Sequence, residues 1–146
     1  MFKSTYFTLE EFLVSDTAVK KKIQNTPSWD DIEHLRELSI FLDKIREAWG
    51  EPIYISSGYR CAKLNKLVGG KDTSVHKIGY AADIYVKGGK KAMDKFGEWL
   101  VNWLKTSGES WDQLIQETSS TGGYWYHIGL RNNKGEQRKM IFGLAV

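Results

Sequence analysis

The sequence is poor in several features that mark particular classes of protein. Cys61 is its only cysteine, which excludes an internal disulfide and any zinc knuckle built from cysteines. No apolar run approaches the ~20 residues that a helix needs to cross a membrane, so stable membrane insertion is not expected. The formal net charge is only +3 and is dispersed, so charge alone does not indicate a nucleic-acid partner. The segment after Met1 lacks the apolar stretch of a secretory signal peptide.

What the sequence does contain is typical of one compact soluble domain. Its 146 residues are 41% hydrophobic and 27% charged, a composition that excludes disorder. A chain of this length buries about 68–70% of its unfolded surface and needs no disulfide scaffold. We find no internal repeat and no dividing linker, so residues 1–146 are expected to form a single domain. Composition by itself indicates no function.

Two helical signals stand in the first third of the chain. Thr8 and Glu11 form a capping box that predicts a short helix. Ser28 precedes a long segment in which apolar residues recur every three or four positions up to Trp49, and Gly50 follows directly. Further helices are predicted over 60–67 and 90–106.

Strand signals dominate the rest of the chain. Strands are predicted over 53–56, 81–86, 113–117 and 124–130, each ended by glycine or a polar turn. The turn at 132–135 predicts a further hairpin, with a last strand near 140–144. Because helices come first and hairpin-linked strands follow, we predict an α+β domain with N-terminal helices packed on a central antiparallel sheet.

Three histidines and one carboxylate carry the chemical signal. His34 lies beside the apolar stripe of the long helix, where a solvated side chain is expected. His76 lies in an irregular glycine-containing loop, and His127 lies in an aromatic strand. Asp83 lies inside an apolar strand, where a carboxylate needs a cation, a metal or several donors. Taken singly, each has a plain structural explanation, such as a lysine partner for Asp83 or a buried, hydrogen-bonded neutral imidazole for His127.

Taken together, His76, Asp83 and His127 indicate more. Two imidazoles and one carboxylate are a common ligand set of catalytic zinc, which keeps a fourth position for water. Water bound there has its pKa lowered to about 7. Structural zinc usually has four protein ligands, often cysteines, and this chain has a single cysteine. An open, hydrolytic zinc site is therefore favoured.

Spaced motifs extend this pattern over most of the chain. Ser74-x-His76-x-x-Gly79-x-Ala81-x-Asp83 is followed by Trp125-x-His127. Upstream lie Phe7-Thr8-Leu9-Glu10-Glu11-Phe12, Ser57-Gly58-Tyr59-Arg60, Asn65 and Val68-Gly69-Gly70, and Asp112-Gln113-Leu114-Ile115-x-Glu117 lies between the histidines. From about Phe7 to Phe142 the sequence resembles the M15 family of zinc D-Ala-D-Ala carboxypeptidases and related peptidoglycan endopeptidases. Hedgehog signalling domains share the metal-site architecture of that family.

The resemblance implies one zinc ion per chain, held by His76, Asp83 and His127. It also implies that Arg60 engages a carboxylate of the peptide substrate, a role that suits the bidentate guanidinium fork. The alternative for Arg60 is a surface arginine that stabilises a turn. Ser74 either hydrogen-bonds the substrate or shapes its own loop.

One position departs from the family pattern. Many members carry an acidic residue three positions before the last zinc histidine, and here that position is Tyr124. Short phage and bacterial relatives close a Gln-Leu-Ile-x-Glu strand with a glutamate, so Glu117 is assigned as the catalytic base and Asp112 as a weaker candidate. The register of the hairpin decides whether the Glu117 carboxylate reaches the metal. A tight turn puts Leu114 opposite His127, and a wide or bulged loop brings Glu117 closer.

The leading hypothesis is zinc-dependent hydrolysis of an amide bond in peptidoglycan stem peptides, by a D-Ala-D-Ala carboxypeptidase or an endolysin-type endopeptidase. The alternative is a catalytically silent zinc module that binds cell-wall peptide or a protein partner, an option that Tyr124 keeps open. Nucleic-acid binding is disfavoured, because the lysines at 20–22 and 90–91 form separate clusters typical of solvated faces or of weak attraction to an anionic wall.

We expect a monomer made in the cytoplasm, encoded by a phage or prophage and either released at lysis or carried in a virion.

Overall fold

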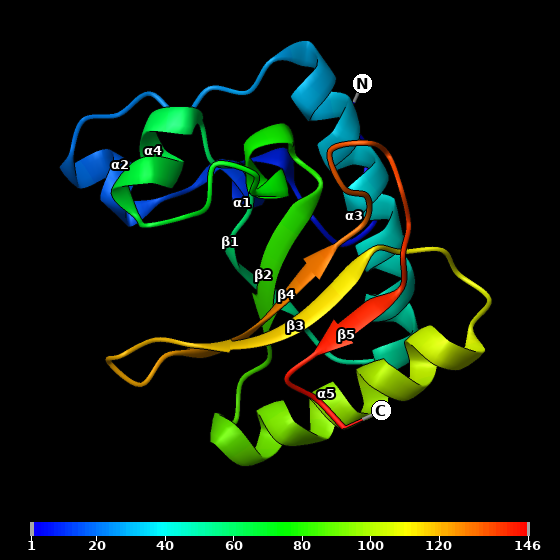
Figure 1. The fold of residues 1–146 in the computed structure, drawn as a ribbon. Coiled ribbons are helices and arrows are strands. Elements are labelled where there is room, and N and C mark those ends of the chain that lie inside the picture. Colours follow the sequence, from blue (N-terminus) through cyan, green and yellow to red (C-terminus); the bar gives the residue numbers. More distant parts are fainter. Residues whose placement is uncertain (1, 146) are drawn as a thin grey trace.

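The computed structural model describes residues 2–145 (Figure 1). In chain order, the described residues form α1 (Leu9–Leu13), α2 (Asp16–Lys20), α3 (Trp29–Trp49), β1 (Tyr54–Ser57), α4 (Ala62–Leu67), the 3₁₀ helix η1 (Val75–Ile78), β2 (Ala81–Tyr85), α5 (Gly89–Thr106), β3 (Gln113–Thr118), β4 (Tyr124–Gly129) and β5 (Met140–Phe142). The α+β class is confirmed. Among these residues no helix is both long enough and apolar enough to cross a membrane.

The helix ends follow local chemistry. Thr8 and Glu11 form the expected capping box at the start of α1. Ser28 caps α3 in the same way with Asp31, and Gly50 ends α3 in the left-handed region at φ 84°. Helix α2 was not predicted. It begins where the Ser15 side chain accepts a hydrogen bond from the Ala18 backbone N–H.

The sheet has the strand order β1-β2-β4-β3-β5. The first four strands of this order pair antiparallel, as predicted. In the two central pairings, His127 lies opposite Asp83 on β2 and opposite Ile115 on β3. This register matters for the site, because directly opposite residues of antiparallel strands point to the same face of a sheet.

The predicted direction of the last strand, antiparallel to its neighbour in a hairpin, was wrong. The turn at 132–135 forms, with the Gly135 N–H donating to the Asn132 carbonyl at 3.0 Å, but β5 pairs parallel to β3 rather than forming a hairpin with β4. The cause lies at the start of β3. There the Met140 N–H donates to the Asp112 carbonyl at 2.8 Å and the Lys139 N–H donates to the Trp111 carbonyl at 3.1 Å. Because both strands begin at the same end, they run in the same direction and the sheet is mixed.

The two faces of the sheet have different roles. Ala82, Ile84, Tyr126 and Ile128 are fully buried in the hydrophobic core that α3 and α5 complete, and the Tyr126 hydroxyl donates to the Met93 carbonyl of α5 at 2.7 Å. Alternation along each strand turns the intervening residues, Asp83 and His127 among them, to the opposite face. Figure 1 shows α1, α2 and α4 gathered at one end of the sheet, with α3 and α5 along its other sides.

Candidate metal centre and cleft

Three segments of the chain bring His76, Asp83 and His127 together. His76 lies on η1, directly before β2, Asp83 lies in the middle of β2, and His127 lies opposite Asp83 on β4. His76 and Asp83 are buried, and His127 is partly buried. The three side chains form a group that can hold a metal ion.

The spacing of the donor atoms fits zinc. His76 Nε2 lies 3.2 Å from Asp83 Oδ1 and 3.2 Å from His127 Nδ1, and His127 Nδ1 lies 3.4 Å from Asp83 Oδ1. Donor atoms of a tetrahedral zinc site lie about 3.3–3.4 Å apart, because each zinc–ligand bond is about 2.0–2.1 Å long. Asp83 Oδ1 is also buried and accepts no hydrogen bond from any residue in the described range. Buried carboxylate oxygens rarely lack a partner, so this atom is available to a cation.

The tautomer of His76 is set by a backbone group. Its Nδ1 lies 2.7 Å from the Gly58 carbonyl oxygen, which can only accept a hydrogen bond. Nδ1 therefore carries the proton, and the lone pair of Nε2 points toward the space shared with Asp83 Oδ1 and His127 Nδ1, where a metal ion would be bound.

Two glycines make this arrangement possible. A Cβ on Gly58 would lie 2.5 Å from the Phe12 carbonyl oxygen, so a side chain there would push the strand end away from α1. Gly79 ends η1 at φ 85°, and a Cβ on it would lie 2.6 Å from the Asp31 carbonyl oxygen. Gly58 thus allows the backbone segment that contacts the His76 ring to approach α1, and Gly79 allows the end of η1 to approach α3.

Electrostatics keep the carboxylate ionised. Burial of Asp83 opposes its charged form, but the attraction of the two imidazoles in their protonated form outweighs burial and holds the pKa of Asp83 well below its usual range. A metal ligand must be deprotonated, so the carboxylate has the charge state that a divalent cation requires.

A cleft of about 790 Å³ opens above the three donors. Arg60 is one of the residues that line it. Its Nε is buried, and none of the described residues provides that nitrogen with a hydrogen-bond acceptor. Burial lowers the pKa of the Arg60 guanidinium, while the charges of Asp83 and Glu117 oppose that shift. A buried donor without an acceptor favours an anionic ligand. This geometry fits carboxylate binding by Arg60, which stays a prediction.

Glu117 and Trp125 line the same cleft and are paired across β3 and β4. Ile115, not Leu114, lies opposite His127, so Glu117 lies one pair further along on the same face. The Trp125 indole Nε1–H donates to Glu117 Oε1 at 3.3 Å. Tyr124 points to the other face, where its hydroxyl donates to Asp94 of α5 at 3.0 Å. Glu117, rather than Tyr124, therefore shares the face and the cleft of the three donors.

Comparison with known protein families gives an independent result. The family model described as Peptidase M15 matches residues 5–119. This chain belongs to the M15 peptidase family. The expected resemblance is thus confirmed, and membership supports a zinc-dependent metallopeptidase, a hydrolase that acts on a peptide. A comparison with curated proteins found no match.

The M15 match stops short of one of the three candidate metal ligands. It includes His76, Asp83 and Glu117 but ends at residue 119, before His127. The pairing of β2 with β4 supplies the missing member, since it sets His127 directly opposite Asp83. In this M15 peptidase, the tertiary structure therefore adds His127 to the two candidate ligands, His76 and Asp83, that lie within the matched segment.

Asp112 and Ser74, two further residues of the predicted site, both form hydrogen bonds within the protein. Asp112 is buried, and its carboxylate accepts hydrogen bonds from Arg138 Nε at 2.8 Å, Arg138 Nη2 at 2.9 Å and the Arg138 N–H at 3.0 Å. Both of its oxygens are thus occupied. Ser74 caps η1, its hydroxyl oxygen accepting from the His76 N–H at 3.3 Å. Its hydroxyl shapes the loop while its side chain also lines the cleft.

Two further residues support the centre without being predicted to do so. His34 was expected to be solvated, and this is wrong. Its ring stacks on Tyr80 at 4.0 Å between centroids, and its Nδ1 lies 2.6 Å from the Ile78 carbonyl at the end of η1. The contact ties α3 to the segment that carries His76. Trp125 could have been found from the sequence, because alternation in Trp125-x-His127 already places both on one face.

Proposed function

We propose that this M15 peptidase catalyses zinc-dependent hydrolysis of an amide bond in peptidoglycan stem peptides, as a D-Ala-D-Ala carboxypeptidase or an endolysin-type endopeptidase. The observation that carries the proposal is the pairing of two features in one cleft. Three donor atoms have the spacing of a tetrahedral zinc site, and Arg60, which lines the same cleft, has a buried Nε without an acceptor among the described residues. A metallopeptidase for a peptide that carries a carboxylate needs both.

His76, Asp83 and His127 would hold the zinc ion, one per chain. When bound, zinc supplies a Lewis acid that polarises a carbonyl and lowers the pKa of water to about 7. Three protein donors leave a fourth position free, as catalytic zinc sites require. Gly58 supports this role through its carbonyl, which orients the His76 ring.

Arg60 would bind a carboxylate of the substrate, either a D-Ala terminus or a D-Glu side chain. Its buried Nε has no acceptor among residues 2–145, so a carboxylate in the cleft would satisfy it. Two parallel N–H donors fix the orientation of a carboxylate as well as its position. Ser74 would contribute to substrate binding from the η1 cap, where it borders the same cleft.

Glu117 would act as general base and then as general acid. It takes a proton from the attacking water and returns it to the amine that leaves. Trp125 would hold the Glu117 carboxylate in place through its indole N–H. We also propose that residues 1–146 act as one M15-like domain and as a monomer, and that the protein reaches the wall by phage-type release or as part of a virion.

The experiment is mass spectrometry of fragments released from purified peptidoglycan, with and without a zinc chelator. We expect release that the chelator stops and added zinc restores, and the fragment masses identify the bond. Asp83→Asn should abolish release, whereas the exposed Asp30→Asn serves as a matched control and should retain it. If protein with bound zinc releases nothing from several wall chemistries, the silent binding module replaces the enzyme.

A further inference from the structure

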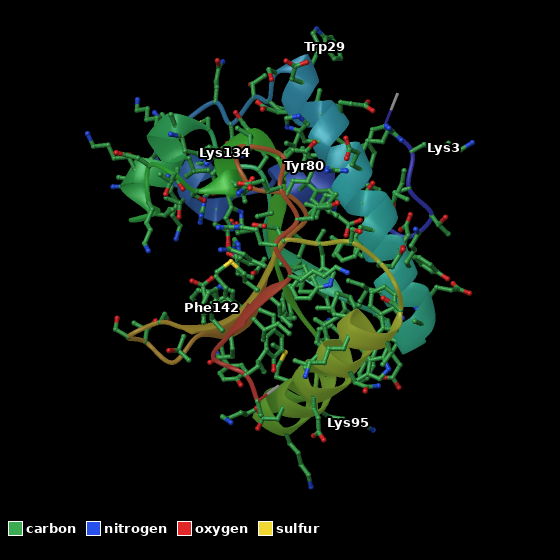
Figure 2. All side chains as sticks on the ribbon, turned by 45° about the vertical axis from the view of Figure 1, so that its right-hand side comes forward. Lys3, Trp29, Tyr80, Lys95, Lys134 and Phe142 are labelled. Atoms are coloured by element: carbon green, nitrogen blue, oxygen red, sulfur yellow. The ribbon has the colours of Figure 1, made fainter. Side chains whose placement is uncertain are left out.

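One end of the molecule carries a concentration of lysines that borders the cleft. It is formed by two segments, residues 15–23 with α2 and residues 62–72 with α4. We call it the lysine face, and every one of its lysines is exposed: Lys20, Lys21, Lys22, Lys63, Lys66 and Lys71. Figure 2 shows nitrogen-tipped side chains extending into solvent around α4.

Asn25 holds the two segments of the lysine face together. Its side-chain Nδ2 donates to the Leu13 carbonyl at 3.0 Å and to the Tyr59 carbonyl at 2.9 Å, and its Oδ1 accepts from the Cys61 N–H at 2.8 Å. The chain that leaves α2 is thereby fixed to the chain that enters α4. Figure 1 shows α2 and α4 together at the same end of the sheet.

The lysine face differs in charge from the rest of the molecule. Its two segments contain six lysines and two aspartates, a net charge of +4, so the remaining residues carry −1 of the chain's +3. Within residues 2–145 none of these six lysines forms an ion pair. Helix α5 is also rich in lysine, but Asp94 and Glu98 interrupt its lysines and Asp94 pairs with Lys90 at 2.9 Å.

The lysine face is continuous with the cleft. Lys71 belongs to the face and also lines the cleft, and the adjacent segment 68–70 does the same. The cleft rim continues through Lys134, whose neighbour Asn133 donates to the Thr73 carbonyl at 2.8 Å. An extended anion bound along the face would therefore end beside the mouth of the cleft.

We propose that the lysine face is a docking surface for an anionic phosphodiester polymer of the bacterial cell wall. Six exposed ammonium groups without partners complement a polymer that bears a negative charge in every repeat. The choice of a wall polymer depends on the proposed function, because such a polymer is linked to the same network as the stem peptides.

Other polyanions fit the lysine face less well. Binding of single-stranded nucleic acid relies on aromatic rings that stack on bases, and neither segment of the face contains an aromatic residue. Exposed apolar side chains are limited to Val19, Leu67 and Val68, which are 77%, 49% and 43% exposed. Val19 and Leu67 lie on helices of five and six residues, and Val68 directly follows the second; these helices are too short for the amphipathic helix that lies in a bilayer surface.

The test measures binding of the full chain to soluble poly(glycerol phosphate), which contains no peptide bond. In the triple variant Lys21→Gln/Lys63→Gln/Lys66→Gln, affinity at low salt should fall about tenfold or more, with a flatter salt dependence. The matched control Lys91→Gln/Lys95→Gln/Lys105→Gln removes the same charge from α5, and Lys95 lies at the far end of the molecule from α4 (Figure 2). Its affinity should stay within about twofold of wild type.

Two results would overturn the inference. One is an equal loss of affinity in both triple variants, which would make net charge the only determinant. The other is wild-type binding to duplex DNA, or to vesicles of phosphatidylglycerol and phosphatidylcholine, that matches or exceeds binding to the polymer. Both triple variants should hydrolyse a soluble stem peptide at the wild-type rate. A wild-type protein that binds the polymer but hydrolyses no stem peptide would refute the proposed function and not the docking surface.

Discussion

At the scale of single residues, the group proposed to hold the metal is separate from the residue proposed to move the proton. His76, Asp83 and His127 converge on one point, whereas Glu117 stands one strand pair away with its carboxylate fixed by Trp125. The groups are thus close enough to act on one substrate but chemically separable by mutation. This separation makes a sharp test of the proposed base possible.

For Glu117→Gln we expect the hydrolysis rate to fall by about 10²–10⁴-fold, the usual contribution of general acid–base catalysis. Zinc content and peptide binding should be unchanged, because the amide keeps the shape and the Trp125 contact but takes no proton. Steady-state kinetics and metal analysis check this. A rate within a few-fold of wild type would remove Glu117 from the mechanism and direct attention to the silent-module alternative.

At the scale of elements, the position of η1 depends on its contacts with α3. His34 stacks on Tyr80 and donates to the carbonyl that ends η1, and η1 carries His76. In His34→Phe the stacked ring remains but the donor is lost. We expect a loss of about 1 kcal/mol in the free energy of unfolding and weaker zinc binding by about tenfold. Urea unfolding and zinc titration measure the two effects, and unchanged zinc affinity would show that η1 holds its position without α3.

The ion pair between Asp112 and Arg138 ties the segment that leads into β5 to the start of β3. Burial of Asp112 opposes its charge, but the hydrogen bonds from Arg138 prevail and hold the pKa of Asp112 below its usual value. A carboxylate whose pKa is lowered by folding stabilises the protein at pH values above its unfolded pKa of about 3.9. That stability is lost as the pH falls through the lower, folded pKa.

Arg138→Met should therefore lower the unfolding temperature of the metal-free protein by several degrees at pH 7. The difference from wild type should shrink at pH 3 and below, as the wild-type carboxyl also becomes protonated. Thermal unfolding of both metal-free proteins at the two pH values checks this. A difference that stays constant with pH would mean that Arg138 contributes through packing rather than through the charge of Asp112.

At the scale of the whole molecule, the candidate metal centre joins three separate parts of the fold. Its donors come from η1, β2 and β4, so metal that binds only the folded chain must stabilise it. Free zinc at one hundred times its dissociation constant should raise the free energy of unfolding by about 2.7 kcal/mol. Calorimetry with and without zinc measures the rise. In Asp83→Asn it should vanish, and a rise that persists would place the zinc elsewhere.

The sequence by itself determined the local features of this protein. Side-chain caps at Thr8 and Ser28 and the left-handed Gly50 depend on neighbours within a few residues, so the helix ends were predictable. Alternation placed Trp125 and His127 on one face, and the spaced motifs identified the family that the comparison confirmed. These features need no knowledge of which strands pair.

Only the tertiary structure decided how distant segments meet. The register of β3 against β4 put Ile115 opposite His127, and the anchoring of residues 138–140 on Asp112 made β5 parallel. The burial of Arg60 Nε without an acceptor and the contact of His34 with η1 likewise depend on long-range packing. Strand pairing and burial bring together residues far apart in the chain, and local patterns carry no information on those distances. The donor spacing that fits zinc is a product of that pairing.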